Sequence, residues 1–272
     1  MVCYKYNVFY VFYILAILVL GLLLGVESFT PPERLTHASA LVGSKLYFFG
    51  GTNHVEFLND VFYLDVSNTF NVSSPPWVNL TTIPFRSALA TVTVRDVNNE
   101  PTIYLFGGYM LDIKTGEITS TPILHTLNLH TFEWNIPSIS GTEPQKRKEM
   151  ESVIDSNGKI YIFSGATDYS LNQTTNRVFN EMVILDTVGL TWSMGSTIDS
   201  PLGRIDYTAT LLSNGVIVYI GGRVLEHDSD NYVDEADISQ INLYDTISSK
   251  WSSTVRIFVS IKNNLFYIFT YI

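Results

Sequence analysis

The sequence predicts an all-β fold, a β-propeller of four full blades followed by a partial fifth, and three observations support it. A short apolar strand ends on two small residues four times, and the second glycine recurs every 57 residues. A turn signal precedes each of these strands, and a tryptophan follows each of them. A fixed period of this length indicates a repeat architecture, and four strands per repeat are typical of propeller blades.

The repeated strand reads K-L-Y-F-F-G-G in its first copy, from Lys45 to Gly51. It returns as I-Y-L-F-G-G at 103–108, I-Y-I-F-S-G at 160–165 and I-V-Y-I-G-G at 217–222. A continuous apolar run is expected of a strand that is covered on both faces. Glycine permits a backbone turn that a side chain would block. The glycines of the motif are Gly50, Gly51, Gly107, Gly108, Gly165, Gly221 and Gly222.

Turns and tryptophans mark the other strands of each repeat. Asn157-Gly158 and Asn214-Gly215 stand before the third and fourth copies of the apolar strand. Asn-Gly between apolar runs is the strongest short hairpin signal, because both central residues adopt positive φ. The tryptophans are expected to fill the wedge between blades that diverge outward. They are Trp77, Trp134, Trp192 and Trp251.

These marks together resemble the kelch repeat, over almost the whole chain after residue 34. The resemblance is to kelch propellers of the galactose-oxidase central-domain type. It implies a non-enzymatic propeller that binds a protein or peptide partner through its loops. Galactose oxidase itself needs a copper site and a thioether crosslink from a cysteine. The only cysteine here is Cys3, so the sequence predicts neither that chemistry nor any cofactor or metal.

Three segments are expected: a signal peptide or signal-anchor helix at 1–28, the propeller at 29–253, and the partial fifth repeat at 254–272. The run 8–26 carries no charge, and its length fits either a cleaved signal or a membrane span. This predicts a protein of the secretory pathway, secreted or membrane-anchored. In the fifth repeat, Thr270-Tyr271 stand where the two glycines should be. Both a truncated longer ring and a closed four-bladed ring with a terminal hairpin remain open.

The formal net charge of −10 argues against a nucleic-acid partner, which requires a basic footprint. The one basic cluster, Lys146-Arg147-Lys148, is flanked by glutamates and is interpreted as a solvated connection between blades. His125 and His130 are the only histidines close in sequence, and their odd spacing would place them on opposite sides of a strand.

The candidate binding surface is formed by the loops that follow the glycine pairs. These loops leave their blades at equivalent points, so they are expected to gather at one end of the propeller, where function usually lies. The surface would offer Tyr109, Tyr169, Arg223 and Tyr232 to a protein, a peptide or a glycan. Alternative functions are a degenerate carbohydrate-binding relative of galactose oxidase and a membrane-tethered adhesion or receptor ectodomain. Sequons at Asn71, Asn79 and Asn172 predict N-glycosylation.

Overall fold

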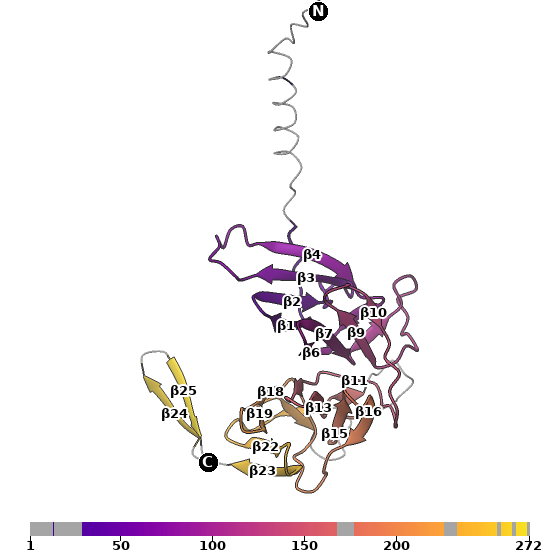
Figure 1. The fold of residues 1–272 in the computed structure, drawn as a ribbon. Helices are drawn as coiled ribbons and strands as arrows, with labels where there is room; N and C mark the ends of the chain where they lie inside the picture. The colour runs from indigo at the N-terminus through magenta and orange to yellow at the C-terminus, as the bar shows by residue number, and fades with distance from the viewer. Residues whose placement is uncertain are drawn as a thin grey trace, which may run out of the picture.

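The computed structural model describes Tyr13 and residues 29–167, 177–225, 233–254, 257–262 and 265–270. From residue 29 onward, every regular element in these ranges is a β-strand. Four antiparallel four-stranded sheets follow one another along the chain (Figure 1). The predicted kelch-type propeller fold is therefore confirmed.

Each blade pairs its four strands in an antiparallel sheet. Blade 1 comprises β1 (Ala38–Val42), β2 (Lys45–Phe49), β3 (Asp60–Asp65) and β4 (Trp77–Thr82). Blade 2 comprises β6 (Thr91–Val97), β7 (Glu100–Phe106), β9 (Leu124–Asn128) and β10 (Trp134–Asn135). Blade 3 comprises β12 (Ser152–Ile154), β13 (Lys159–Phe163), β15 (Met182–Asp186) and β16 (Thr191–Met194). Blade 4 comprises β18 (Thr208–Leu211), β19 (Val216–Ile220), β22 (Ile241–Asp245) and β23 (Lys250–Thr254).

Short strands pair the segment leading into a blade with the segment that follows its glycine pair. In blade 1 this pairing is a single bridge between Leu35 and Thr52. In the other blades β5 (Arg86–Ala88) pairs with β8 (Tyr109–Leu111), β11 (Arg147–Lys148) with β14 (Ala166–Thr167), and β17 (Arg204–Ile205) with β20 (Arg223–Leu225). A further strand, β21 (Val233–Glu235), pairs with β20. The predicted loops thus begin as small sheets.

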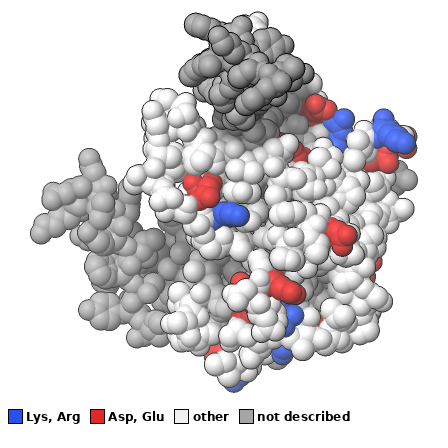
Figure 2. All heavy atoms as spheres, turned by 45° about the horizontal axis from the view of Figure 1, so that its top comes forward, with Lys and Arg blue, Asp and Glu red and all other residues white. Residues whose placement is uncertain are grey.

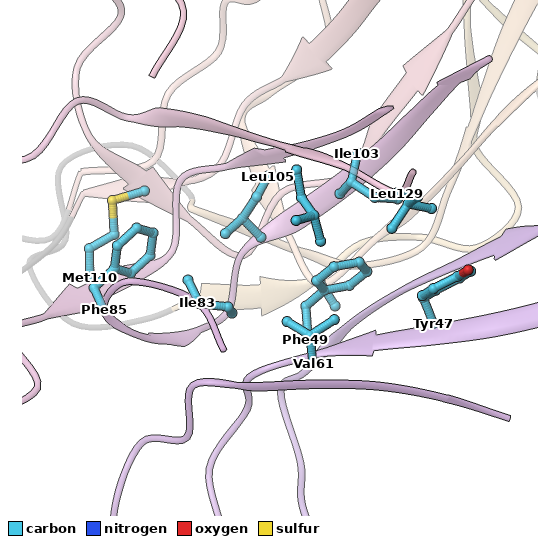
Figure 3. Close-up of a cluster of buried hydrophobic side chains, with 11 residues drawn as sticks. Tyr47, Phe49, Val61, Ile83, Phe85, Ile103, Leu105, Met110 and Leu129 are labelled. Carbon is cyan, nitrogen blue, oxygen red and sulfur yellow. The ribbon is translucent and has the colours of Figure 1, made fainter. Parts of the chain in front are cut away.

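The hydrophobic core is divided among the spaces between successive blades. The second strand of a blade directs alternate residues to opposite faces. One face, here called the outgoing face, packs on the next blade, as Tyr47 and Phe49 of blade 1 do. The opposite, incoming face packs on the previous blade, as Ile103 and Leu105 of blade 2 do. Figure 3 shows these side chains meeting between the two sheets.

The glycine pairs allow close contact between successive blades. The Gly51 N–H donates to the carbonyl of Ser87, 2.7 Å away in the segment leading into blade 2. The same bond joins Gly108 to Arg147 at 2.8 Å and Gly165 to Arg204 at 3.2 Å. Gly50 has φ of 56°, and a Cβ there would lie 2.3 Å from the Ser87 carbonyl oxygen. Glycine is therefore required at this position by both backbone conformation and space.

The two ends of the chain are described only in part. The predicted targeting segment 1–28 lies outside the described residues, apart from Tyr13. In the part of the chain that the structure describes, no helix has the length and apolar character to cross a membrane. After blade 4, β24 (Ile257–Lys262) and β25 (Leu265–Thr270) form a separate hairpin, and the partial fifth repeat at 254–272 stays a prediction.

Candidate functional site

An arginine stands at the start of the segment leading into each blade. These arginines are Arg34, Arg86, Arg147 and Arg204. Arg147 donates to the Ser164 carbonyl at 3.1 Å and to the Glu181 carboxylate at 2.6 Å. Its guanidinium also lies 3.9 Å from the ring centroid of Phe179, and the residue is 1% exposed. The prediction that the basic cluster is a solvated connection is therefore wrong, because Arg147 holds the start of blade 3 to its second and third strands.

Arg34 repeats this arrangement in blade 1. It donates to the Gly50 carbonyl at 2.9 Å and to both carboxylate oxygens of Asp60 at 2.7 and 2.8 Å. Arg204 points to the equivalent Gly221 carbonyl at 3.4 Å. The intervals to the second glycine are 17 residues for Arg34 and 18 for both Arg147 and Arg204, but 22 for Arg86. The near-equal intervals of the other three are the sequence signal that could have identified them.

Each arginine is followed by a tight turn, here called the lead-in turn, whose central residue has positive φ. The φ values are 57° for Thr36, 58° for Leu89, 61° for Glu149 and 54° for Asp206. These residues are linked by backbone hydrogen bonds from blade to blade. Leu89 donates to Thr36 at 2.9 Å, Glu149 to Leu89 at 3.1 Å, and Asp206 to Glu149 at 3.3 Å. The lead-in turns of all four blades therefore form one continuous rim.

This rim surrounds a cavity of about 130 Å³. Its lining combines the lead-in turns with the residues next to them: Thr36, His37, Leu89, Ala90, Glu149, Met150, Glu151, Asp206 and Tyr207. Burial raises the pKa of Glu151. Burial and, secondarily, the charge of Arg34 lower the pKa of His37, so the cavity favours neutral forms of both groups.

Two of the predicted surface residues lie next to this rim. Tyr109 begins β8, 5.2 Å from the Phe57 ring, and the Lys148 ammonium lies 5.5 Å from its centroid. Arg223 begins β20 and donates through Nε to the Asp206 carboxylate at 2.8 Å. That hydrogen bond, with the charges of Asp206 and Glu149, raises the pKa of Arg223. The rim thus combines aromatic, acidic and basic side chains.

The other predicted site residues lie elsewhere or are not described. Tyr169, Tyr232 and Asn172 lie outside the described residues. Asn71 is exposed in the turn before β4, where its side-chain Oδ1 accepts from the Ser73 N–H at 2.9 Å, and Asn79 is exposed within β4. Trp192 and Trp251 are buried between blades, whereas Trp77 and Trp134 are partly buried.

The described residues contain no group of three or more histidine, cysteine, aspartate or glutamate side chains arranged to hold a metal ion. His125 lies in the core with its Nε2 2.9 Å from the Thr121 hydroxyl and its ring 4.6 Å from Phe85. His130 is exposed in the turn after β9. The two histidines are therefore not parts of one site.

His125 should make the stability of the protein depend on pH. Burial and, to a lesser extent, the charge of Lys146 lower its pKa from 6.5 to about 4. As the pH falls below 6.5, His125 of the unfolded chain binds a proton, whereas His125 of the folded chain binds one only near pH 4. Protonation therefore favours the unfolded chain between these two values. The free energy of unfolding should fall by about 3 kcal/mol across this window. Urea titrations at several pH values should show a shallower decline in His125→Gln; an unchanged decline would contradict this assignment.

The surface is otherwise sparsely charged. On the face shown in Figure 2, the Lys and Arg side chains appear in small separate groups among uncharged and acidic residues. On this face the basic residues do not form the continuous track that binds a phosphate backbone.

Comparison with known proteins places these repeats in a family. The KLHDC2/KLHL20/DRC7 Kelch-repeats domain matches residues 36–262. Kelch domain-containing protein 3 of Rattus norvegicus is 28% identical over 234 residues, which are 81% of this chain and 56% of the relative. The Homo sapiens protein of the same name is 28% identical over 236 residues, with the same coverage. Host cell factor 1 of Rattus norvegicus is 30% identical over 155 residues, covering 50% of this chain and 7% of that protein.

The relatives correct one prediction and confirm another. Kelch domain-containing protein 3 and Host cell factor 1 are intracellular proteins, so the predicted localisation in the secretory pathway is wrong. The chain spans little more than half the length of Kelch domain-containing protein 3. The match to the family domain covers most of the chain and spans the four blades and β24. The chain therefore belongs to the kelch-repeat family.

Proposed function

We propose that this chain is a non-catalytic protein-interaction module whose partner binds on the rim of lead-in turns. The observation that carries the proposal is the hydrogen-bonded series from Thr36 to Asp206, which fixes segments of four blades around one cavity. Binding residues are commonly presented by short segments on a rigid scaffold. A rigid rim also loses little conformational freedom when a partner docks.

The side chains on the rim suit a protein or peptide partner. Tyr109 and Arg223 belong to residue types that are enriched among the energetically dominant residues of protein interfaces. Arg223 is exposed although it is paired with Asp206, so a partner can contact its guanidinium without displacing that pair. Thr36 and His37 line the cavity, and the buried hydroxyl of Thr36 and Nδ1 of His37 have no hydrogen-bond partner among the described residues.

Peptides selected from a phage-displayed library on the full chain should bind at this rim. Truncation of a central interface residue commonly costs 2 kcal/mol or more, so Tyr109→Ala or Arg223→Ala should weaken the selected peptides by at least about tenfold. Ser67→Ala, in the exposed turn between β3 and β4, is the matched control and should leave binding unchanged. Peptides that bind equally to all three variants would place the interface elsewhere and contradict the proposal.

A further inference from the structure

The two outermost blades each carry one face that the described chain leaves partly open. On the outgoing faces of blades 1 to 3, the two central side chains of the second strand are buried, as Tyr104 and Phe106 illustrate. Their equivalents in blade 4, Val218 and Ile220, are only partly buried. On the incoming face of blade 1, Phe48 is likewise partly buried, whereas its blade 2 equivalent, Leu105, is fully buried.

The hydrogen-bonding groups that join successive blades are also unused at these two ends. The N–H of Gly222 and the carbonyl of Asp206 have no backbone partner among the described residues. At the other end the same is true of the Thr36 N–H and the Arg34 carbonyl. In the three internal junctions the equivalent groups bond to each other. The Gly222 N–H therefore matches the Arg34 carbonyl, and the Thr36 N–H matches the Asp206 carbonyl.

The first strands of blades 2 and 3 meet through a set of three hydroxyl groups. Between blades 2 and 3, the hydroxyls of Thr91 and Thr93 both hydrogen-bond the hydroxyl of Ser152, with 2.9 Å between Thr91 Oγ1 and Ser152 Oγ. Both threonines are buried there. The junctions on either side carry apolar residues in these strands: Ala40 and Val92 both pack on the core between blades 1 and 2, and Val153 and Ala209 both pack on the core between blades 3 and 4.

The open faces repeat the hydroxyl set of the junction between blades 2 and 3. Thr208 pairs with Ile220 just as Thr91 pairs with Phe106, each opposite the residue before the glycine pair. Thr210 correspondingly takes the place of Thr93. Ser39 pairs with Phe48 in blade 1 just as Ser152 pairs with Ile162 in blade 3.

All three hydroxyl residues of the open faces, Ser39, Thr208 and Thr210, are exposed. Phe29 and Arg34 cover the neighbouring Phe62 but leave Ser39 exposed. The hairpin of β24 and β25 is not hydrogen-bonded to blade 4, so it does not extend that sheet.

We propose that the outgoing face of blade 4 binds the incoming face of blade 1 in a second copy of this chain, with Thr208 and Thr210 enclosing Ser39. A second copy of the chain provides all three features that the open face of blade 4 lacks. These are an apolar face to cover it, partners for its two backbone hydrogen-bonding groups, and a serine hydroxyl between its two threonines. A contact between two different surfaces gives a closed ring when its rotation closes and a chain of molecules otherwise.

Disulfide crosslinking tests the contact directly. Hydroxyls in hydrogen-bonding contact place their Cβ atoms near the separation that a disulfide needs. Full-length Ser39→Cys and Thr208→Cys variants, each also carrying Cys3→Ser, are mixed and oxidised mildly. A disulfide between the two substituted positions should give a species of twice the 30.6 kDa chain mass. The yield should exceed at least fivefold that of Ser67→Cys mixed with Ser248→Cys, two exposed positions in the outer turns of the same blades.

A second variant separates this contact from chance association. Gly221→Ala has open space around the added Cβ in the single chain, but the equivalent Cβ at Gly107 would lie 2.4 Å from the next blade's carbonyl. Gly221→Ala should therefore reduce the crosslink at least fivefold, whereas Gly43→Ala, with similar φ and equally open space, should not. A crosslink no stronger than the outer-turn control would overturn the proposal. So would a disulfide that forms within one chain when both cysteines are placed in the same molecule.

Discussion

Replacing Gly50 with alanine should destabilise the protein by about 3–5 kcal/mol, whereas the same change at Gly221 should cost only about 1–2 kcal/mol. The φ values of the two glycines are 56° and 69°, so alanine meets similar backbone strain at both. At Gly50 the new methyl group would also lie 2.3 Å from the Ser87 carbonyl, which belongs to the backbone of the next blade's lead-in segment. At Gly221 nothing lies within 4 Å.

The comparison is best made by urea denaturation of dilute protein, where the single chain is measured. The difference in the midpoint at constant slope gives the cost of crowding the junction between blades. Equal costs for the two variants would mean that Gly221 is covered like Gly50. The conclusion that the outgoing face of blade 4 is open in the single chain would then be wrong.

Truncation of Arg147 to alanine should cost about 2–4 kcal/mol, because it removes a fully buried side chain that pairs with the partly exposed Glu181, and it leaves the Ser164 carbonyl without its donor. The side chain of Arg147 is fully buried, and it also lies on the Phe179 ring. The loss should appear as a lower free energy of unfolding.

Arg86 provides the matched control for Arg147. It lies one residue before Ser87, which is the blade 2 residue equivalent to Arg147, and it pairs with Glu56. The two side chains of that pair are 29% and 50% exposed. Exposed pairs contribute little, so Arg86→Ala should cost no more than about 1 kcal/mol. If the two truncations proved equally mild, the role of the arginines in fastening lead-in segments would be refuted.

The sequence predicted the fold because the period of the glycine pairs is strict. The first glycine of the first two pairs, Gly50 and Gly107, fits against a carbonyl of the next blade, so a side chain cannot replace it freely. The third pair begins with Ser164, and the structure explains this exception. Ser164 keeps φ of 62°. Its hydroxyl oxygen accepts from the Arg204 N–H at 2.6 Å and lies 2.5 Å from the Phe179 carbonyl oxygen, so the side chain makes hydrogen bonds where the glycines leave space.

The site was harder to predict than the fold. The rim depends on lead-in turns whose residues, Thr36, Leu89, Glu149 and Asp206, share a backbone conformation but no side-chain chemistry. Arg147 appeared to be part of a charged surface run, because burial of its guanidinium depends on Glu181 and Phe179, which lie over thirty residues away in the sequence. Local composition carries no information about such partners.

Hydrogen–deuterium exchange of the full chain with and without a selected peptide tests most directly the proposal that the rim is the interaction surface. The peptide should slow exchange in the lead-in turns and in β8 and β20, around Tyr109 and Arg223. The last strands of the blades, such as β4 and β16, should exchange unchanged. Protection confined to those outer strands would contradict the account, because the partner would then bind the edge of the propeller and not its rim of lead-in turns.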